Sequence, residues 1–154
     1  MTAPYTAIVP PPGTPFPDGM ADALANLHTR TVDALAGYET MVAKAEPTFR
    51  PVAETFRDIH ARHAAATARM LAREGREADA DGSFMSAVNR AVVSLRALVD
   101  DIDADVLSAI RNGEQHVLDA FDDAIAAGRA EYDDELVAMR DELQAAIDRT
   151  SNPK

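Results

Sequence analysis

The chain has 154 residues, of which 47% are hydrophobic and 27% are charged, so it is long enough for one globular domain and is not composed like a disordered chain. Its net charge of −11 disfavours nucleic acid and anionic membrane surfaces as partners, and the lack of Cys excludes disulfides, thiolate zinc sites and cysteine nucleophiles. No apolar run approaches the roughly 20 residues that span a bilayer, and no secretory signal is recognisable, so we expect a cytoplasmic protein.

The first 19 residues are rich in proline, with Pro4, Pro10, Pro11, Pro12, Pro15 and Pro17. Proline at this density opposes a helix and favours extended backbone. We therefore predict an arm over residues 1–19, either loose or laid on the surface of the domain.

A helical period begins after the arm. One face of the first helix, expected over residues 20–45, carries Leu24, Leu27, Thr31, Leu35, Tyr38 and Val42. Glu46-Pro47 ends this helix, because a residue before proline is pushed out of the helical region. Pro47 and Pro51 then fit only the first turn of a second helix.

The second helix shows a similar stripe, made of Val52, Phe56, Ile59, His63, Ala66 and Met70. Gly75 is a candidate for its C-cap, and the polar stretch from Gly75 to Gly82 predicts a loop. Ser83 could cap a short helix that ends near Val99 and carries Phe84, Val88, Val92 and Leu95.

Two more helices complete the chain. Asp103 or Asp105 could cap the third long helix, whose apolar face is Val106, Ile110, Val117, Phe121 and Ile125, and which ends at Gly128. The last helix shows Tyr132, Leu136, Met139, Leu143 and Ile147, and residues 151–154 form a frayed tail.

This order predicts an all-α fold with its domain over residues 20–150. The short helix falls in the long crossover between the second and third long helices. Two hairpins joined by such a crossover form a ferritin-like antiparallel four-helix bundle. Coiled-coil packing without the crossover is the alternative architecture.

Several short motifs resemble a known family: Gly82-Ser83, Arg90 and Leu95-Arg96 in the crossover, Asp105, Ile110, Gly113-Glu114 and Phe121 in the third long helix, and, more weakly, Gly37-Tyr38 in the first. They resemble the uncharacterised bacterial four-helix-bundle family of the ferritin-like superfamily, a domain of unknown function. The resemblance covers about residues 24–147. It implies a ferritin-like bundle and no established activity.

Candidate metal ligands come from residues in phase with the apolar stripes. Di-metal bundles use Glu-x-x-His on two helices, and this sequence contains no such motif. The second helix carries His60-x-x-His63 instead, Glu39 lies between Leu35 and Val42, and Glu114 lies between Ile110 and Val117. One interpretation is an iron or manganese site formed by Glu39, His60, His63 and Glu114. The other, which we favour because interior polar groups are normally paired, is a structural cluster in which Glu114 bonds His63 or Glu39.

Other chemistry has little support in the sequence. Glu77, Asp79, Asp81 and Gly82 match the start of a calcium-binding loop, but Val88 occupies the position that needs a bidentate Glu. No nucleophile elbow or phosphate-binding loop is present, and His28 and His116 are expected on the surface.

We therefore predict no catalytic residue and no cofactor. The expected protein is a non-catalytic structural or interaction bundle that self-associates as a homo-oligomer. The alternative is a ferritin-like metal-binding or oxidase protein with a reduced ligand set.

Overall fold

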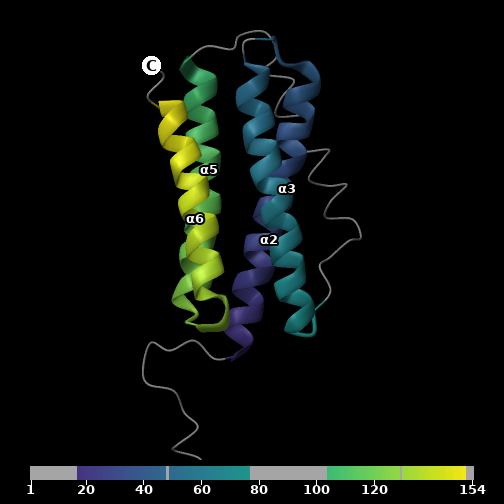
Figure 1. The fold of residues 1–154 in the computed structure, drawn as a ribbon, viewed down its shortest axis with the longest axis vertical. Helices are drawn as coiled ribbons and strands as arrows, with labels where there is room; N and C mark the ends of the chain where they lie inside the picture. Colours follow the sequence, from purple (N-terminus) through teal and green to yellow (C-terminus); the bar gives the residue numbers. More distant parts are fainter. Residues whose placement is uncertain (1–16, 48, 77–103, 129, 152–154) are drawn as a thin grey trace, which may run out of the picture.

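A computed structural model describes residues 17–47, 49–76, 104–128 and 130–151. This part of the chain contains four helices and no strand: α2 (Pro17–Lys44), α3 (Arg50–Arg73), α5 (Ala104–Ala126) and α6 (Ala130–Ser151). Figure 1 shows them side by side, with α2 next to α3 and α5 next to α6. The all-α, four-helix prediction is confirmed for the described residues.

The first helix starts earlier than predicted. α2 begins at Pro17, inside the stretch assigned to the arm. Proline fits the first turn of a helix because the N–H that it lacks would have no partner inside the helix there. Residues 1–16, the rest of the predicted arm, lie outside the described residues.

The signals predicted for the two ends of α3 are present, except that Pro47 lies in the turn before the helix rather than in its first turn. Pro51 lies in the first turn of α3. At the other end Gly75 adopts a φ of 76°, the left-handed conformation that ends many helices. The Gly75 N–H donates to the Ala72 carbonyl at 3.1 Å and the Arg76 N–H donates to the Leu71 carbonyl at 2.9 Å, so two carbonyls of the last turn are satisfied.

Contacts between the helices show their relative directions. The start of α2 meets the end of α3 through the ion pair of Asp22 and Arg76, whereas the rings of Tyr38 and Phe56 stack near the other end. These two helices therefore run in opposite directions, as Figure 1 also shows.

α3 and α6 also run in opposite directions. Glu74, at the end of α3, bonds Tyr132 near the start of α6, whereas His63, earlier in α3, bonds Glu142 later in α6. α5 and α6 are joined by a tight turn in which Gly128 has a φ of 75°. The predicted crossover helix, Ser83 to Val99, lies outside the described residues.

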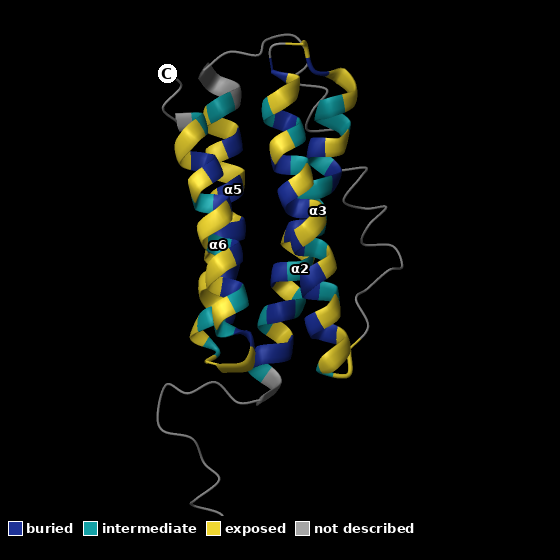
Figure 2. Cartoon of the chain, in the orientation of Figure 1, coloured by how far each residue is buried: buried dark blue, intermediate teal, exposed yellow. Residues whose placement is uncertain are grey.

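The core lies along the inner faces of the four helices (Figure 2). Its largest fully buried apolar side chains are Tyr132, Phe56, Phe121, Met20, Leu24, Leu27, Met70, Leu71, Leu136 and Leu143. Leu35 and Val42, which we placed on the inner face of α2, are only partly buried. Among the described helices, none is both long and apolar enough to cross a membrane.

Candidate functional site

Glu114 occupies the interior of the bundle. It lies in α5 between the buried residues Ile110 and Val117, and its exposed fraction is 2%. The spacing of four and three residues places all three side chains on one face of the helix, as the sequence predicted. A carboxylate in this position must be hydrogen-bonded, because burying an unpaired charge costs several kcal/mol.

Groups from two other helices bond this carboxylate. The Tyr38 hydroxyl of α2 donates to Glu114 Oε1 at 2.5 Å. His60 Nε2 of α3 lies 2.9 Å from Glu114 Oε1 and 3.1 Å from Oε2, so the imidazole N–H donates to the same carboxylate. The partners of Glu114 are therefore Tyr38 and His60, and not His63 or Glu39 as the sequence suggested. We refer to Tyr38, His60 and Glu114 as the polar triad.

Aromatic packing holds the triad in place. The Tyr38 ring stacks on Phe56 with 5.1 Å between centroids and on His60 with 5.5 Å. Burial, together with the neighbouring Glu114 carboxylate, raises the pKa of Tyr38 well above its ordinary value of 10. Tyr38 is therefore protonated at neutral pH and acts as a hydrogen-bond donor.

His63 belongs to a second pair, closer to the surface. Its exposed fraction is 2%, and its Nε2 lies 2.9 Å from Oε1 of Glu142, which also accepts a bond from Arg62. Its ring meets Phe121 edge-on at 5.6 Å and His60 edge-on at 6.4 Å between centroids. Burial and the nearby His60 lower the pKa of His63 from 6.5 to about 4, so the ring is neutral at pH 7.

His63 also lines a groove of about 340 Å³ between α3 and α6. Arg62 and Arg69 flank it from α3, and Glu142 and Glu135 flank it from α6; each Arg is paired with the Glu opposite. The groove reaches the His63–Glu142 pair but is not lined by any member of the triad.

One ring nitrogen of His60 and one of His63 has no hydrogen-bond partner among the described residues. In both residues this nitrogen is Nδ1, and it is buried. Because each ring uses Nε2 for a carboxylate, the two Nδ1 atoms are the positions where an added donor or cation would bind.

Glu39 does not belong to this cluster. Its side chain is exposed, whereas its neighbour Tyr38 faces inward. Successive residues on a helix are about 100° apart, so these two side chains cannot share a face. The prediction that Glu39 points into the bundle is wrong because Leu35 and Val42, which set its phase, lie on the edge of the buried face.

The described residues do not fit a carboxylate-bridged metal centre. No group of three or more His, Asp or Glu side chains among them is arranged to hold a metal ion. Glu114 already accepts bonds from two neighbours, and Glu39 is on the outside. Glu77, Asp79, Asp81 and Gly82, whose match to a calcium-binding loop the sequence already disfavoured, lie outside the described part of the chain.

The sequence did not predict several of the contacts that the structure shows. His28 is half-buried rather than on the surface, and its Nδ1 lies 2.8 Å from the Thr67 hydroxyl. Tyr38 could have been recognised, because a Tyr within an apolar stripe needs a partner for its hydroxyl. Glu142 gave no such signal, since it lies at the rim of the α6 stripe. His116 is exposed, as predicted.

Comparison with known proteins yields one match. A family model described as "Domain of unknown function (DUF2383)" matches residues 20–127, which include α3, α5 and nearly all of α2. No curated protein and no solved structure matches the chain.

Proposed function

The chain belongs to the DUF2383 domain family, and from this premise we propose that it is a non-catalytic structural or interaction protein whose triad stabilises the bundle. One observation carries the proposal. The buried carboxylate of Glu114 is engaged by a hydroxyl from α2 and an imidazole from α3, so that three helices meet at one residue.

Such a site does not resemble a reaction centre. A catalytic carboxylate must reach a substrate within hydrogen-bond distance, directly or through one water. Glu114 and His60 are 2% and 0% exposed, and the groove between α3 and α6 is lined by neither of them. Their hydrogen bonds are made to each other and to Tyr38, which is how interior polar groups that stabilise a fold are satisfied.

The proposal includes the ferritin-like arrangement of the helices. In its support, α2 and α3 run in opposite directions, α3 and α6 do so as well, and the chain between α3 and α5 is long whereas the other two connections are short. A long connection between two hairpins is the feature that distinguishes this arrangement from a bundle with only short loops.

Self-association is also part of the proposal. Val137 is the one large hydrophobic side chain that is exposed among the described residues. An interface on the described surface would therefore be small or polar rather than an extensive apolar contact. Light scattering after gel filtration tests this directly, and a monomer at all concentrations would remove self-association from the proposal.

A second candidate function is metal binding. It is favoured by the free Nδ1 atoms of His60 and His63, which lie three residues apart on one helix. The first proposal predicts that protein incubated with Fe²⁺, Mn²⁺ or Zn²⁺ and then desalted retains no stoichiometric metal. Stoichiometric metal in the wild type that is lost in Glu114→Gln or His60→Gln, with helicity unchanged, would replace the first proposal with the second.

A further inference from the structure

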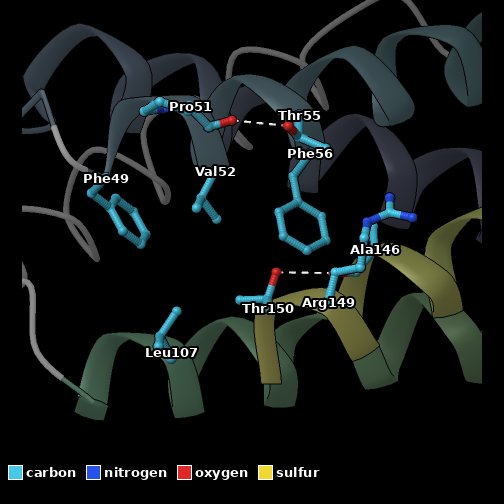
Figure 3. Close-up of a pocket in the computed structure, with 9 residues that line it drawn as sticks. All are labelled: Phe49, Pro51, Val52, Thr55, Phe56, Leu107, Ala146, Arg149 and Thr150. Atoms are coloured by element: carbon cyan, nitrogen blue, oxygen red, sulfur yellow. Dashed lines mark hydrogen bonds between the residues drawn. The ribbon is translucent and has the colours of Figure 1, made fainter. Parts of the chain in front are cut away.

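One end of the bundle contains an apolar pocket of about 360 Å³, formed where the ends of three helices meet (Figure 3). Val52 and Phe56 come from the first two turns of α3, and Leu107 comes from the first turn of α5. Ala146 and Arg149 come from the last two turns of α6. This volume lies near the lower end of the roughly 300–1,000 Å³ that ligand pockets occupy, so the pocket suits a small molecule.

The interior of the pocket offers apolar contacts. Phe56 and Ala146 are 1% and 3% exposed, so they belong to its deepest part. The two hydroxyls in the described lining belong to Thr55 and Thr150, and each already donates at 2.9 Å to a main-chain carbonyl of its own helix. A ligand group that enters the pocket therefore finds hydrocarbon and no free hydroxyl among these residues, which favours an apolar group over a polar one.

Arg149 is the one charged side chain among the nine described residues that line the pocket. It is exposed, which places it at the mouth, and it forms no ion pair with any other described residue. By contrast, each Arg that lines the groove between α3 and α6 is paired with a Glu of α6. A guanidinium presents a planar fork of donors that matches a carboxylate, so the mouth of the pocket favours an anionic group of this shape.

A second copy of the bundle is a poorer occupant than a small molecule. Among the described residues Val137 is the only large hydrophobic side chain that is exposed, so the described surface of a neighbouring copy has little to insert into the pocket. Val137 also lies twelve residues before Arg149 along α6, about 18 Å away, so it does not extend the apolar surface of the pocket into a larger interface.

We propose that this pocket binds a small monocarboxylate with an apolar tail, such as a fatty acid of medium chain length. The tail lies between Phe56 and Leu107, and the carboxylate lies at the mouth beside Arg149. Burial of the tail provides most of the affinity. The contact between the carboxylate and Arg149 is exposed to water and therefore contributes less, but it selects an anion over a neutral molecule of the same length.

Isothermal titration calorimetry of the full chain with octanoate tests the proposal. We expect one site per chain with a Kd on the order of 1 mM or below, as befits a ligand of about ten non-hydrogen atoms. Hexanoate, which is two methylene groups shorter, should bind about 15-fold more weakly, because each buried methylene changes the affinity by a factor of about four. No binding of octanoate at concentrations well above this Kd, or equal affinities for the two acids, would overturn the proposal.

Filling the pocket tests where the tail binds. Val52→Phe adds a ring at a half-buried position of the lining and should abolish octanoate binding, because the ring occupies the space of the tail. Circular dichroism shows whether this variant is folded. Octanoate binding by folded Val52→Phe with the affinity of the wild type would overturn the proposal.

A second variant changes only the exposed mouth of the pocket and does not depend on the core. Arg149→Gln should weaken octanoate binding about three- to fivefold and leave the binding of neutral octanol unchanged, because only the carboxylate uses the guanidinium. Arg73→Gln is the matched control, since Arg73 is exposed in the last turn of α3, at the other end of the helix from Val52; octanoate should bind this variant as it binds the wild type. Equal octanoate affinity in the wild type and Arg149→Gln, or an equal loss in the two Arg variants, would overturn the proposal.

Discussion

Replacing Glu114 by Ala would leave two donors unsatisfied inside the bundle. The hydroxyl of Tyr38 and the imidazole N–H of His60 would lose their acceptor, and each buried unsatisfied group costs about 1–3 kcal/mol. Removal of the carboxylate also ends the cost of burying a charge, which offsets part of this loss. We expect a net decrease of about 2–4 kcal/mol in the free energy of unfolding, a large share of the roughly 5–15 kcal/mol typical of a domain.

Glu114→Gln should cost less, about 1–2 kcal/mol, because an amide oxygen at the position of Oε1 can still accept from both donors at 2.5 and 2.9 Å. The amide NH₂ would then face His60 Nε2 from the position of Oε2, now 3.1 Å away, which explains why the substitution is not neutral. Tyr38→Phe should cost about 1 kcal/mol, since His60 still donates to the carboxylate.

Urea denaturation followed by circular dichroism at pH 7 measures these differences, and no Trp is needed for the signal. Gln115→Ala is a matched control, because Gln115 is the exposed neighbour on α5, and it should change stability by less than about 0.5 kcal/mol. A loss below about 0.5 kcal/mol for Glu114→Ala, or an equal loss for Ala and Gln, would refute the reasoning.

Three further predictions concern other parts of the bundle. The pKa of His63 falls from 6.5 in the unfolded chain to about 4 in the fold, so on acidification the unfolded state binds the proton first. The free energy of unfolding should therefore fall by roughly 2–3 kcal/mol between pH 6.5 and pH 4. Urea midpoints measured across this range should depend less on pH in His63→Gln than in the wild type. Gly75→Ala should destabilise the fold by about 1 kcal/mol, because Gly75 has a φ of 76° that Ala adopts only with strain. Gly113→Ala should stabilise the fold by about 0.5–1 kcal/mol, because Gly113 lies in the middle of α5 with open space at its Cβ position. Melting temperatures that shift in the same direction for both variants would contradict this pair of predictions. Arg69→Ala should change stability by less than about 1 kcal/mol in a urea titration despite the ion pair with Glu135, because both side chains are about half exposed; a loss of several kcal/mol would show that this pair does more than a surface contact.

The periodicity of the sequence was sufficient to predict the four long helices that the structure describes. Leu24 and Leu27, like Leu136 and Leu143, recur at the spacing of one helix face and are fully buried. The ends of helices were also predictable where backbone conformation restricts the residue type: Gly75 and Gly128 both have positive φ. The predicted start of α2 was three residues too late, because proline is compatible with a first helical turn, as at Pro17, as well as with an extended arm.

The polar triad was predicted only in part. Glu114 could be placed in the interior because it lies within the well-defined apolar face of α5. Its partners depend on how α2 and α3 are rotated against α5, and the sequence of one helix alone does not determine that rotation. Glu39 and Tyr38 illustrate this, since a shift of one residue in the phase of α2 exchanges which of them faces inward. The bond between His28 and Thr67 likewise joins residues 39 apart in the chain and depends on the packing of two helices.

The polar triad also restricts how the helices can slide along one another. A shift of α5 by one turn, about 5.4 Å, would bring the side chain of Ile110 or Leu118 to the position of Glu114. The apolar side chains of a bundle tolerate such a shift, because one Leu or Ile can replace another at modest cost. The hydroxyl of Tyr38 and the imidazole of His60 do not tolerate it, because they would face hydrocarbon. One buried carboxylate thus discriminates among packings that the apolar residues alone would leave nearly equal in energy, in the way that a single polar residue selects one alignment of a coiled coil.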